Sequence, residues 1–206
     1  MEGLRSNFLV EWGVAAQALA GETESGDQYL VEPFLNGVLA AVVDGLGHGA
    51  DASAVTQTAI AIMREHAAES ILPLVRRCHA ALLQTRGVVL SLASFNALDE
   101  SMTWLGVGNV EGILFHGNKT ANPSRIALLL RGGVVGYQLP PLRIATLPVT
   151  PGDLLILATD GIRNGFTKGL KVDLPAQFIA DQILAQYGRQ TDDTLVLAVR
   201  YLGMMK

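Results

Sequence analysis

The stretch GVLAAVVDGLGHGADA, residues 37–52, contains the pattern that decides the fold. Its apolar run over residues 37–43 predicts a buried strand that ends at Asp44. A glycine-rich turn follows, and the apolar positions of residues 51–69 then recur at helical spacing. The stretch therefore predicts a strand, a loop and a helix, with a carboxylate at the end of the strand.

Further strands and helices are expected on both sides of this unit. Pro73 suits the first turn of a second helix that ends at Gly87, and a third runs from Pro175 to Gly188. Short polar or glycine turns between the strands favour antiparallel pairing, and the whole indicates an α+β domain with sheets packed together and helices outside. The other expected strands are 8–18, 88–97, 102–107, 111–116, 126–130, 143–149, 154–158 and 194–202.

The composition excludes several classes of protein. The chain has 206 residues, of which 50% are hydrophobic and 17% charged, so one domain over residues 1–206 with a sizeable core is expected. A net charge of −4 indicates no excess of positive charge that would bind nucleic acid or an anionic membrane. No uncharged stretch approaches the ~18 residues of a spanning helix, and residues 1–12 do not resemble a signal peptide. The single Cys78 excludes an internal disulfide and is interpreted as a core residue, so we expect a cytoplasmic protein.

Three aspartates stand out because each adjoins a long apolar strand. Asp44 follows VLAAVV, Asp160 follows LLILAT, and Asp192, with Asp193 beside it, precedes TLVLAV. A buried carboxylate is costly unless backbone N–H groups or a divalent cation compensate it. Any one Asp-Gly pair alone favours an ordinary turn. The joint order is more specific, and Asp27 in SGDQY, near the start of an expected short strand, is a fourth candidate for the same cluster.

These segments resemble a known family. VVDGLGHGADA, PGDLLILATDGI, TDDTLVLAVR and SGDQY are similar to the aspartate motifs of the type 2C metal-dependent protein phosphatases, the PPM superfamily. The bacterial branch of sporulation and sigma-factor regulatory phosphatases is the most similar. Within it, VGNVEGIL and RGGVVGYQLP resemble the feedback phosphatases of the stressosome. The resemblance implies a four-layer α-β-β-α sandwich of two antiparallel sheets flanked by helix pairs.

The resemblance also implies a centre of two Mn²⁺ or Mg²⁺ ions. Asp44 would bridge the ions, and Asp193 would support the neighbouring ligand. The implied metal ligands are Asp27, Asp44, Gly45 through its carbonyl, Asp160 and Asp192, and the implied catalytic residues are Asp44, Asp160, Asp192 and His48. Such a centre activates a water for attack on a phosphoester, so no covalent phosphoenzyme is needed.

The sequence departs from the wider superfamily at three places. Leu46 stands where larger members have histidine, and His48, two residues on, either acts on the leaving group or only shapes the loop. Gly108 is followed by Asn109, where the superfamily often supplies a ligand to a third ion. No arginine adjoins the N-terminal motif, since Arg5 precedes it at a distance.

The implied function is a phosphoserine/phosphothreonine protein phosphatase that acts on phosphorylated STAS-domain proteins of a stressosome and resets that complex. We expect a monomer with no nucleic-acid or membrane partner. The alternatives are a phosphatase of a phosphorylated anti-anti-sigma factor, a non-catalytic pseudophosphatase that binds a partner, and a small-molecule phosphatase. Residues 132–142 form either a substrate-facing loop or a segment packed under a neighbouring strand. Core or surface roles are expected for His66, His79 and His116.

Overall fold

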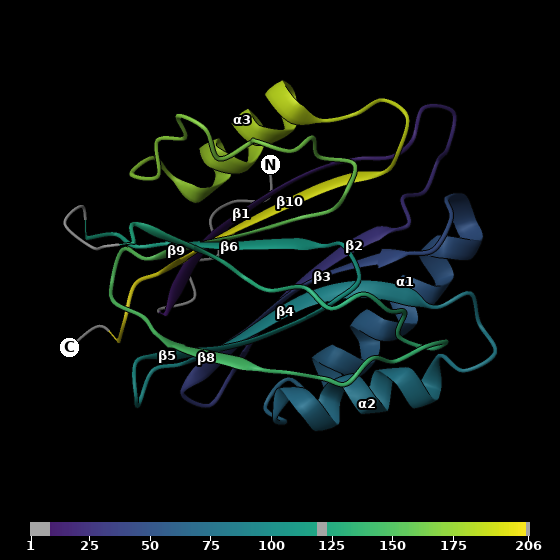
Figure 1. Ribbon diagram of the computed structural model, residues 1–206, viewed down its shortest axis with the longest axis horizontal. Helices are drawn as coiled ribbons and strands as arrows, with labels where there is room; N and C mark the ends of the chain where they lie inside the picture. Colours follow the sequence, from purple (N-terminus) through teal and green to yellow (C-terminus); the bar gives the residue numbers. More distant parts are fainter. Residues whose placement is uncertain (1–8, 119–122, 205–206) are drawn as a thin grey trace.

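The computed structural model describes residues 9–118 and 123–204 as two five-stranded antiparallel sheets packed face to face (Figure 1). Sheet A has the strand order β1-β10-β9-β6-β7, and sheet B has the order β2-β3-β4-β5-β8. The strands of sheet A are β1 (Val10–Gln17), β10 (Thr194–Tyr201), β9 (Leu154–Ala158), β6 (Glu111–Phe115) and β7 (Arg125–Ala127). Those of sheet B are β2 (Asp27–Phe34), β3 (Gly37–Gly45), β4 (Val88–Asn96), β5 (Ser101–Val107) and β8 (Ala145–Pro148).

Helices form the two outer layers. Helices α1 (Gly49–Glu65) and α2 (Ile71–Ala81) cover sheet B, and α3 (Ala176–Tyr187) covers sheet A (Figure 1). The expected α+β sandwich of two antiparallel sheets is confirmed. A helix pair was expected over sheet A. In the described residues, that layer holds α3 and an irregular segment between β9 and α3. Positive φ angles at Gly165 and Gly169 interrupt that segment, and Phe166 supplies its most buried side chain.

Strand β3 shows why its sequence is apolar without interruption. Val38, Ala40 and Val42 enter the core between the sheets, whereas the alternate residues of the strand enter the core beneath α1 and α2. Successive side chains of a strand point to opposite faces, so a strand covered on both faces carries apolar residues at every position. A third core lies between sheet A and α3 and includes Ile156 and Ile179.

Arg200 fastens the segment before α3 to sheet A. Its Nη2 donates to the carbonyls of Val172 at 2.9 Å and Leu174 at 2.6 Å, and its Nε pairs with Glu11 at 3.2 Å. The other oxygen of Glu11 accepts from the backbone N–H of Ala176 at 2.8 Å, at the first residue of α3. One ion pair therefore secures both the helix and the segment that leads into it.

Replacing Arg200 with methionine is expected to lower the free energy of unfolding by about 2–3 kcal/mol, because the Glu11 carboxylate and the acceptor carbonyls lose their donor. The arginine side chain is only 13% exposed. Urea denaturation measures the change. The control is Arg64→Met, since that side chain is 58% exposed and its pair with Glu32 is expected to contribute less than about 1 kcal/mol. Equal losses in the two variants would contradict the assigned role.

None of the helices in the described ranges combines the length and the apolarity that a bilayer crossing requires. The two sheets instead bring four strand ends to one end of the sandwich. The start of β2 lies beside the end of β3, and the end of β9 lies near the start of β10, because both pairs are antiparallel. The candidate aspartates belong to these four strand ends.

Candidate metal centre

Asp27 and Asp44 face each other across the β2–β3 pair, where they are direct register partners. Asp27 is buried, with 4% of its surface exposed, and Asp44 is partly buried. Like charges directly opposite each other destabilise a strand pair. This arrangement therefore favours either a shared proton or a cation between the two carboxylates.

Sheet A contributes Asp160 and Asp192 to the same end of the sandwich. The hydroxyl of Thr159 donates to Asp27 Oδ2 at 2.8 Å and accepts from the backbone N–H of Leu195 at 2.9 Å. This single hydroxyl links the two sheets and places Asp160, the next residue, near the β2–β3 carboxylates. The sequence analysis did not assign Thr159 a role, although its place in Thr-Asp-Gly was a signal.

The electrostatics show that the carboxylates share one environment. Burial raises the pKa of Asp44 to about 8, and repulsion by Asp27, Asp160 and Asp192 adds to that rise. Burial also raises the pKa of Asp27 to about 7, although the hydrogen bond from Thr159 acts in the opposite direction. The pKa of Asp192 is raised by burial and then by Asp160. The charges of Asp27, Asp160 and Asp192 thus oppose the ionisation of neighbouring carboxyls, which favours protons or cations among them.

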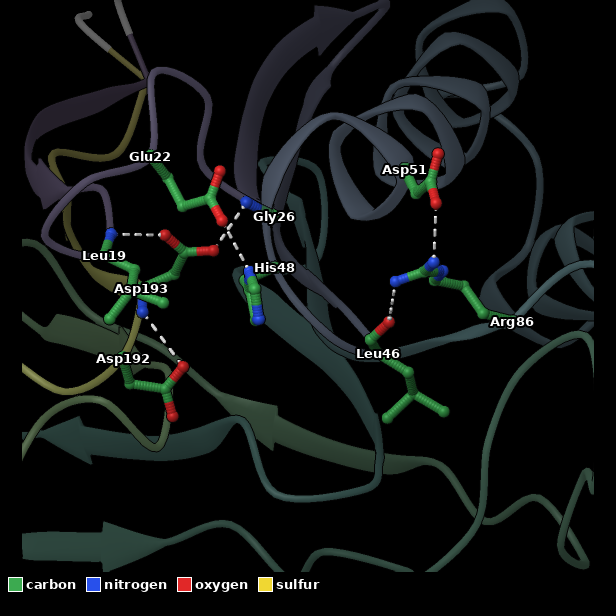
Figure 2. A network of polar contacts seen from close by, with 9 residues as sticks. All are labelled: Leu19, Glu22, Gly26, Leu46, His48, Asp51, Arg86, Asp192 and Asp193. Atoms are coloured by element: carbon green, nitrogen blue, oxygen red, sulfur yellow. Dashed lines mark hydrogen bonds and ion pairs between the residues drawn. The ribbon is translucent and has the colours of Figure 1, made fainter.

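Asp193 anchors the loop that precedes β2 (Figure 2). Its two carboxylate oxygens accept from the backbone N–H groups of Leu19 and Gly26, each at 2.8 Å. Asp192 accepts from the backbone N–H of Asp193 at 2.9 Å. Because backbone donors engage both oxygens of Asp193, this residue holds the loop that leads to Asp27, a role that its sequence motif did not indicate.

The pairs Asp44-Gly45 and Asp160-Gly161 do not form ordinary turns with a left-handed glycine. Neither Gly45 nor Gly161 has a positive φ angle. A Cβ on Gly45 would lie 2.7 Å from the carbonyl oxygen of Ala52 in α1, and a Cβ on Gly161 would lie 2.0 Å from the carbonyl oxygen of Asp193. Glycine is therefore required for close backbone approach, which draws α1 and the start of β10 against the two aspartates.

Asn109 contacts the cluster directly. Its Nδ2 donates to Asp160 Oδ2 at 2.6 Å. An amide donor therefore stands where the wider superfamily often has a carboxylate, and it leaves Asp160 Oδ1 for other partners.

Arg86 reaches the loop after Asp44 from beyond the C-terminal end of α2 (Figure 2). Its Nη1 donates to the carbonyl of Leu46 at 3.1 Å, and its Nη2 donates to Asp51 Oδ2 at 2.9 Å. Gly47 has a φ angle of +97°, and a Cβ there would lie 2.5 Å from Arg86 Nη1. Sequence reasoning missed Arg86 because it sought an arginine beside the N-terminal motif; Arg5, its only candidate, lies outside the described residues.

His48 is the histidine of the loop that leads from the cluster into α1. Its Nδ1 lies 2.7 Å from Glu22 Oε1. The other three histidines are partly buried and have other partners: His66 is the C-cap residue of α1, His79 accepts from the backbone of Gly136, and His116 Nδ1 lies 3.3 Å from Asp153 Oδ2. Cys78 is buried, and burial raises the pKa of its thiol to about 12, which agrees with a core role.

Residues 132–142 are packed against a neighbouring strand at one position and exposed at another. Val135 is fully buried and pairs with Val88 at the start of β4. Tyr137, two residues on, is 78% exposed. The segment lies at the carboxylate end of sheet B, because Gly87, next to Val88, accepts from the backbone N–H of Leu46.

The donors of this cluster suit a hard divalent cation, because carboxylate and carbonyl oxygens are the ligands that Mg²⁺ and Mn²⁺ prefer. No group of three or more His, Cys, Asp or Glu side chains within residues 9–118 and 123–204 is arranged to hold an ion by itself. A centre here would therefore draw on the Gly45 carbonyl and on water as well. A Cβ on Gly26 would lie 3.5 Å from that carbonyl oxygen, so the glycine leaves the space beside it open.

Comparison with known proteins assigns the chain to a family. The family model of stage II sporulation protein E (SpoIIE) matches residues 36–202. The chain belongs to the SpoIIE family. A solved chain of SpoIIE from Bacillus subtilis holds the PP2C phosphatase domain and a fragment of the regulatory domain. It is 23% identical, with a TM-score of 0.75, and the match covers 96% of this chain and 64% of that one. The resemblance to type 2C phosphatases that the aspartate motifs carry is therefore confirmed, and so is the fold.

Two further relatives lie close to this SpoIIE-family chain. Phosphoserine phosphatase RsbX of Bacillus subtilis (strain 168) is 27% identical over 159 residues, 74% of this chain and 77% of RsbX. RsbX crystallised with magnesium has a TM-score of 0.85 at 21% identity over 98% of this chain and all of RsbX. A protein solved in work on the bacterial stressosome as a modular system is 30% identical, with a TM-score of 0.85 over 93% of this chain and 99% of that protein.

Proposed function

We propose that this SpoIIE-family protein is a metal-dependent phosphoserine/phosphothreonine protein phosphatase. The observation that carries the proposal is the meeting of Asp27, Asp44, Asp160 and Asp192 at one end of the sandwich, where the charges of Asp27, Asp160 and Asp192 raise the pKa of Asp44. Two findings about relatives support it: RsbX is a phosphoserine phosphatase, and RsbX has been crystallised with magnesium.

Two divalent ions would be held by the Gly45 carbonyl and by the carboxylates of Asp27, Asp44, Asp160 and Asp192, and both would depend on the charge of Asp44. Two bound Mn²⁺ or Mg²⁺ ions would supply a water of lowered pKa and stabilise charge on the phosphoryl oxygens. The four carboxylates offset the charge of two divalent ions, so the loaded cluster would be close to neutral before a phosphate dianion arrives.

Hydrogen bonds from neighbouring side chains orient the carboxylates of the cluster. Thr159 holds Asp27, Asn109 holds Asp160, and Asp193 holds the loop before β2. Ligands that are oriented by hydrogen bonds need little rearrangement during a reaction, which favours catalysis. His48 would donate a proton to the serine or threonine oxygen as it leaves.

The proposed substrates are phosphorylated STAS-domain proteins of a stressosome, which the protein would reset by removing phosphate. The similarity to RsbX and to a protein of the bacterial stressosome supports this choice. The carboxylate end of sheet B also offers exposed apolar side chains for a protein partner. Leu46 is 39% exposed and Tyr137 is 78% exposed. A phosphorylated anti-anti-sigma factor is the alternative substrate.

A substrate panel tests reaction and substrate together. With Mn²⁺, the protein is expected to release phosphate from phosphorylated stressosome STAS proteins at least about 10-fold faster than from a generic phosphopeptide, a preference of about 1.4 kcal/mol. EDTA should abolish release, and excess Mn²⁺ should restore it. Preference for a phosphorylated anti-anti-sigma factor would select the alternative. Binding of these proteins without turnover would indicate a pseudophosphatase, and chelator-resistant hydrolysis would refute the metal mechanism.

A further inference from the structure

Glu22 and His48 form a side-chain pair beside the carboxylate cluster (Figure 2). Glu22 Oε1 lies 2.7 Å from His48 Nδ1, and the two side chains are 33% and 59% exposed. They come from different parts of the chain, since Glu22 belongs to the loop between β1 and β2 and His48 to the loop between β3 and α1. No motif in the sequence connects them.

The imidazole of His48 does not cap the helix that it precedes. His48 is the N-cap residue of α1, with φ −142° and ψ 170°, but its side chain makes no capping hydrogen bond. N-cap residues are usually Ser, Thr, Asp or Asn because their side chains accept from the free N–H groups of the first turn. The ring instead turns to Glu22, so a role in starting the helix does not account for a histidine here.

The structure around Glu22 is arranged to bring its carboxylate to this place. Asp193 holds both ends of the loop through Leu19 and Gly26, and the backbone N–H of Glu22 donates to the Leu19 carbonyl at 2.9 Å. Gly49 has a φ angle of +72°, and a Cβ there would lie 2.8 Å from Glu22 Oε2. A side chain at residue 49 would therefore displace the carboxylate.

The pair determines which ring nitrogen of His48 remains available. A carboxylate only accepts hydrogen bonds when ionised, so Nδ1 carries the proton shared with Glu22. The second nitrogen, Nε2, then remains for another partner, in a side chain that is 59% exposed. The Cα atom of His48 lies within about 11 Å of that of Gly45, because only three peptide units join them. The backbone N–H of Gly45 in turn donates to the Gly26 carbonyl at 3.2 Å, so the two loops meet at the cluster.

We propose that Glu22 is the positioning residue of His48, and that it orients the ring so that Nε2 donates a proton to the departing serine or threonine oxygen. The inference rests on the phosphatase function proposed above. As an attacking water forms a new P–O bond and loses a proton to solvent, the ester P–O bond breaks and its electron pair stays on the leaving oxygen, which takes the Nε2 proton to become the alcohol. The imidazolium becomes neutral imidazole, Glu22 stays a carboxylate, and solvent returns the proton for the next turnover.

Two substrates separate this role from a structural one. The leaving oxygen of a phosphoserine peptide needs a proton, whereas p-nitrophenolate leaves p-nitrophenyl phosphate as a stable anion. In the full-length chain with Mn²⁺, Glu22→Ala is expected to lower kcat on the peptide about 10- to 100-fold, with KM unchanged and p-nitrophenyl phosphate hydrolysed within about twofold of the wild-type rate. Glu22→Gln, whose amide oxygen still accepts from Nδ1–H, should recover part of the loss. The control is Glu24→Ala, an exposed glutamate of the same loop.

A spectroscopic measurement tests the pair without turnover. In ¹⁵N NMR spectra, His48 of the wild-type chain is expected to be protonated at Nδ1 when neutral, and Glu22→Ala should shift the proton towards Nε2. Equal loss on both substrates, or an unchanged tautomer in Glu22→Ala, would overturn the inference. A wild-type chain that hydrolyses neither substrate would refute the phosphatase function itself, which distinguishes the two failures.

Discussion

Asp44→Asn is expected to abolish Mn²⁺-dependent phosphate release while leaving the protein folded. Asp44 is the carboxylate that faces Asp27 and feels the charges of Asp160 and Asp192. An amide in its place removes the shared negative charge on which both ion positions would depend. We expect a rate loss of at least about 1,000-fold, or about 4 kcal/mol of transition-state stabilisation. Phosphate release from a phosphoserine peptide measures it.

The same variant should be more stable than the wild-type chain in the absence of metal. The substituted amide brings no charge into an environment that raises the pKa of the native carboxyl to about 8, so thermal unfolding at pH 8 with EDTA should occur at a higher temperature. The control is Asp99→Asn, an exposed aspartate beyond the far end of β4, which should change neither property. Turnover close to normal in Asp44→Asn would refute the two-ion proposal.

Without metal, the protein is expected to lose stability as the pH rises from about 4 to 8. Asp27 and Asp44 have folded-state pKa values of about 7 and about 8, above their ordinary value of 3.8. A carboxyl whose pKa is raised by folding stabilises the fold while it is protonated, and this contribution disappears as the pH rises from its unfolded pKa to its folded pKa. Even if the coupled pair acts as one group, the loss is of the order of 4 kcal/mol, since one pKa unit equals about 1.4 kcal/mol.

Urea denaturation in EDTA, repeated across this pH range, measures that loss. Mn²⁺ should reverse it and should stabilise the protein more at pH 8 than at pH 5, because cations replace the protons that the carboxylates have lost. Asp44→Asn is the matched comparison and should show a flatter pH profile, since one of the two titrating groups is gone. A wild-type profile in EDTA that is flat between pH 4 and 8 would contradict the assigned electrostatics.

Elements with strong local patterns could be predicted from the sequence. The apolar run before Asp44 predicted β3, because a strand covered on both faces needs apolar residues throughout, and the order of the aspartate motifs predicted the family that the comparison confirmed. Strand β2 was expected only as a short strand near Asp27, because its mixed residues cover one edge of sheet B. The helix pair over sheet A was expected from resemblance, and glycines at residues 165 and 169 break the segment there.

The amino-acid sequence by itself determined the strand–loop–helix unit at Asp44, the candidate carboxylates and their likeness to a phosphatase family, because these depend on local periodicity and on motifs of neighbouring residues. Only the tertiary structure decided which distant side chains form hydrogen bonds in and around the site. Thr159 meets Asp27 across 132 residues, Asn109 meets Asp160 across 51, and Glu22 meets His48 across 26. Such contacts depend on how the two sheets stack and how the loops are anchored, and no local pattern of residues encodes either.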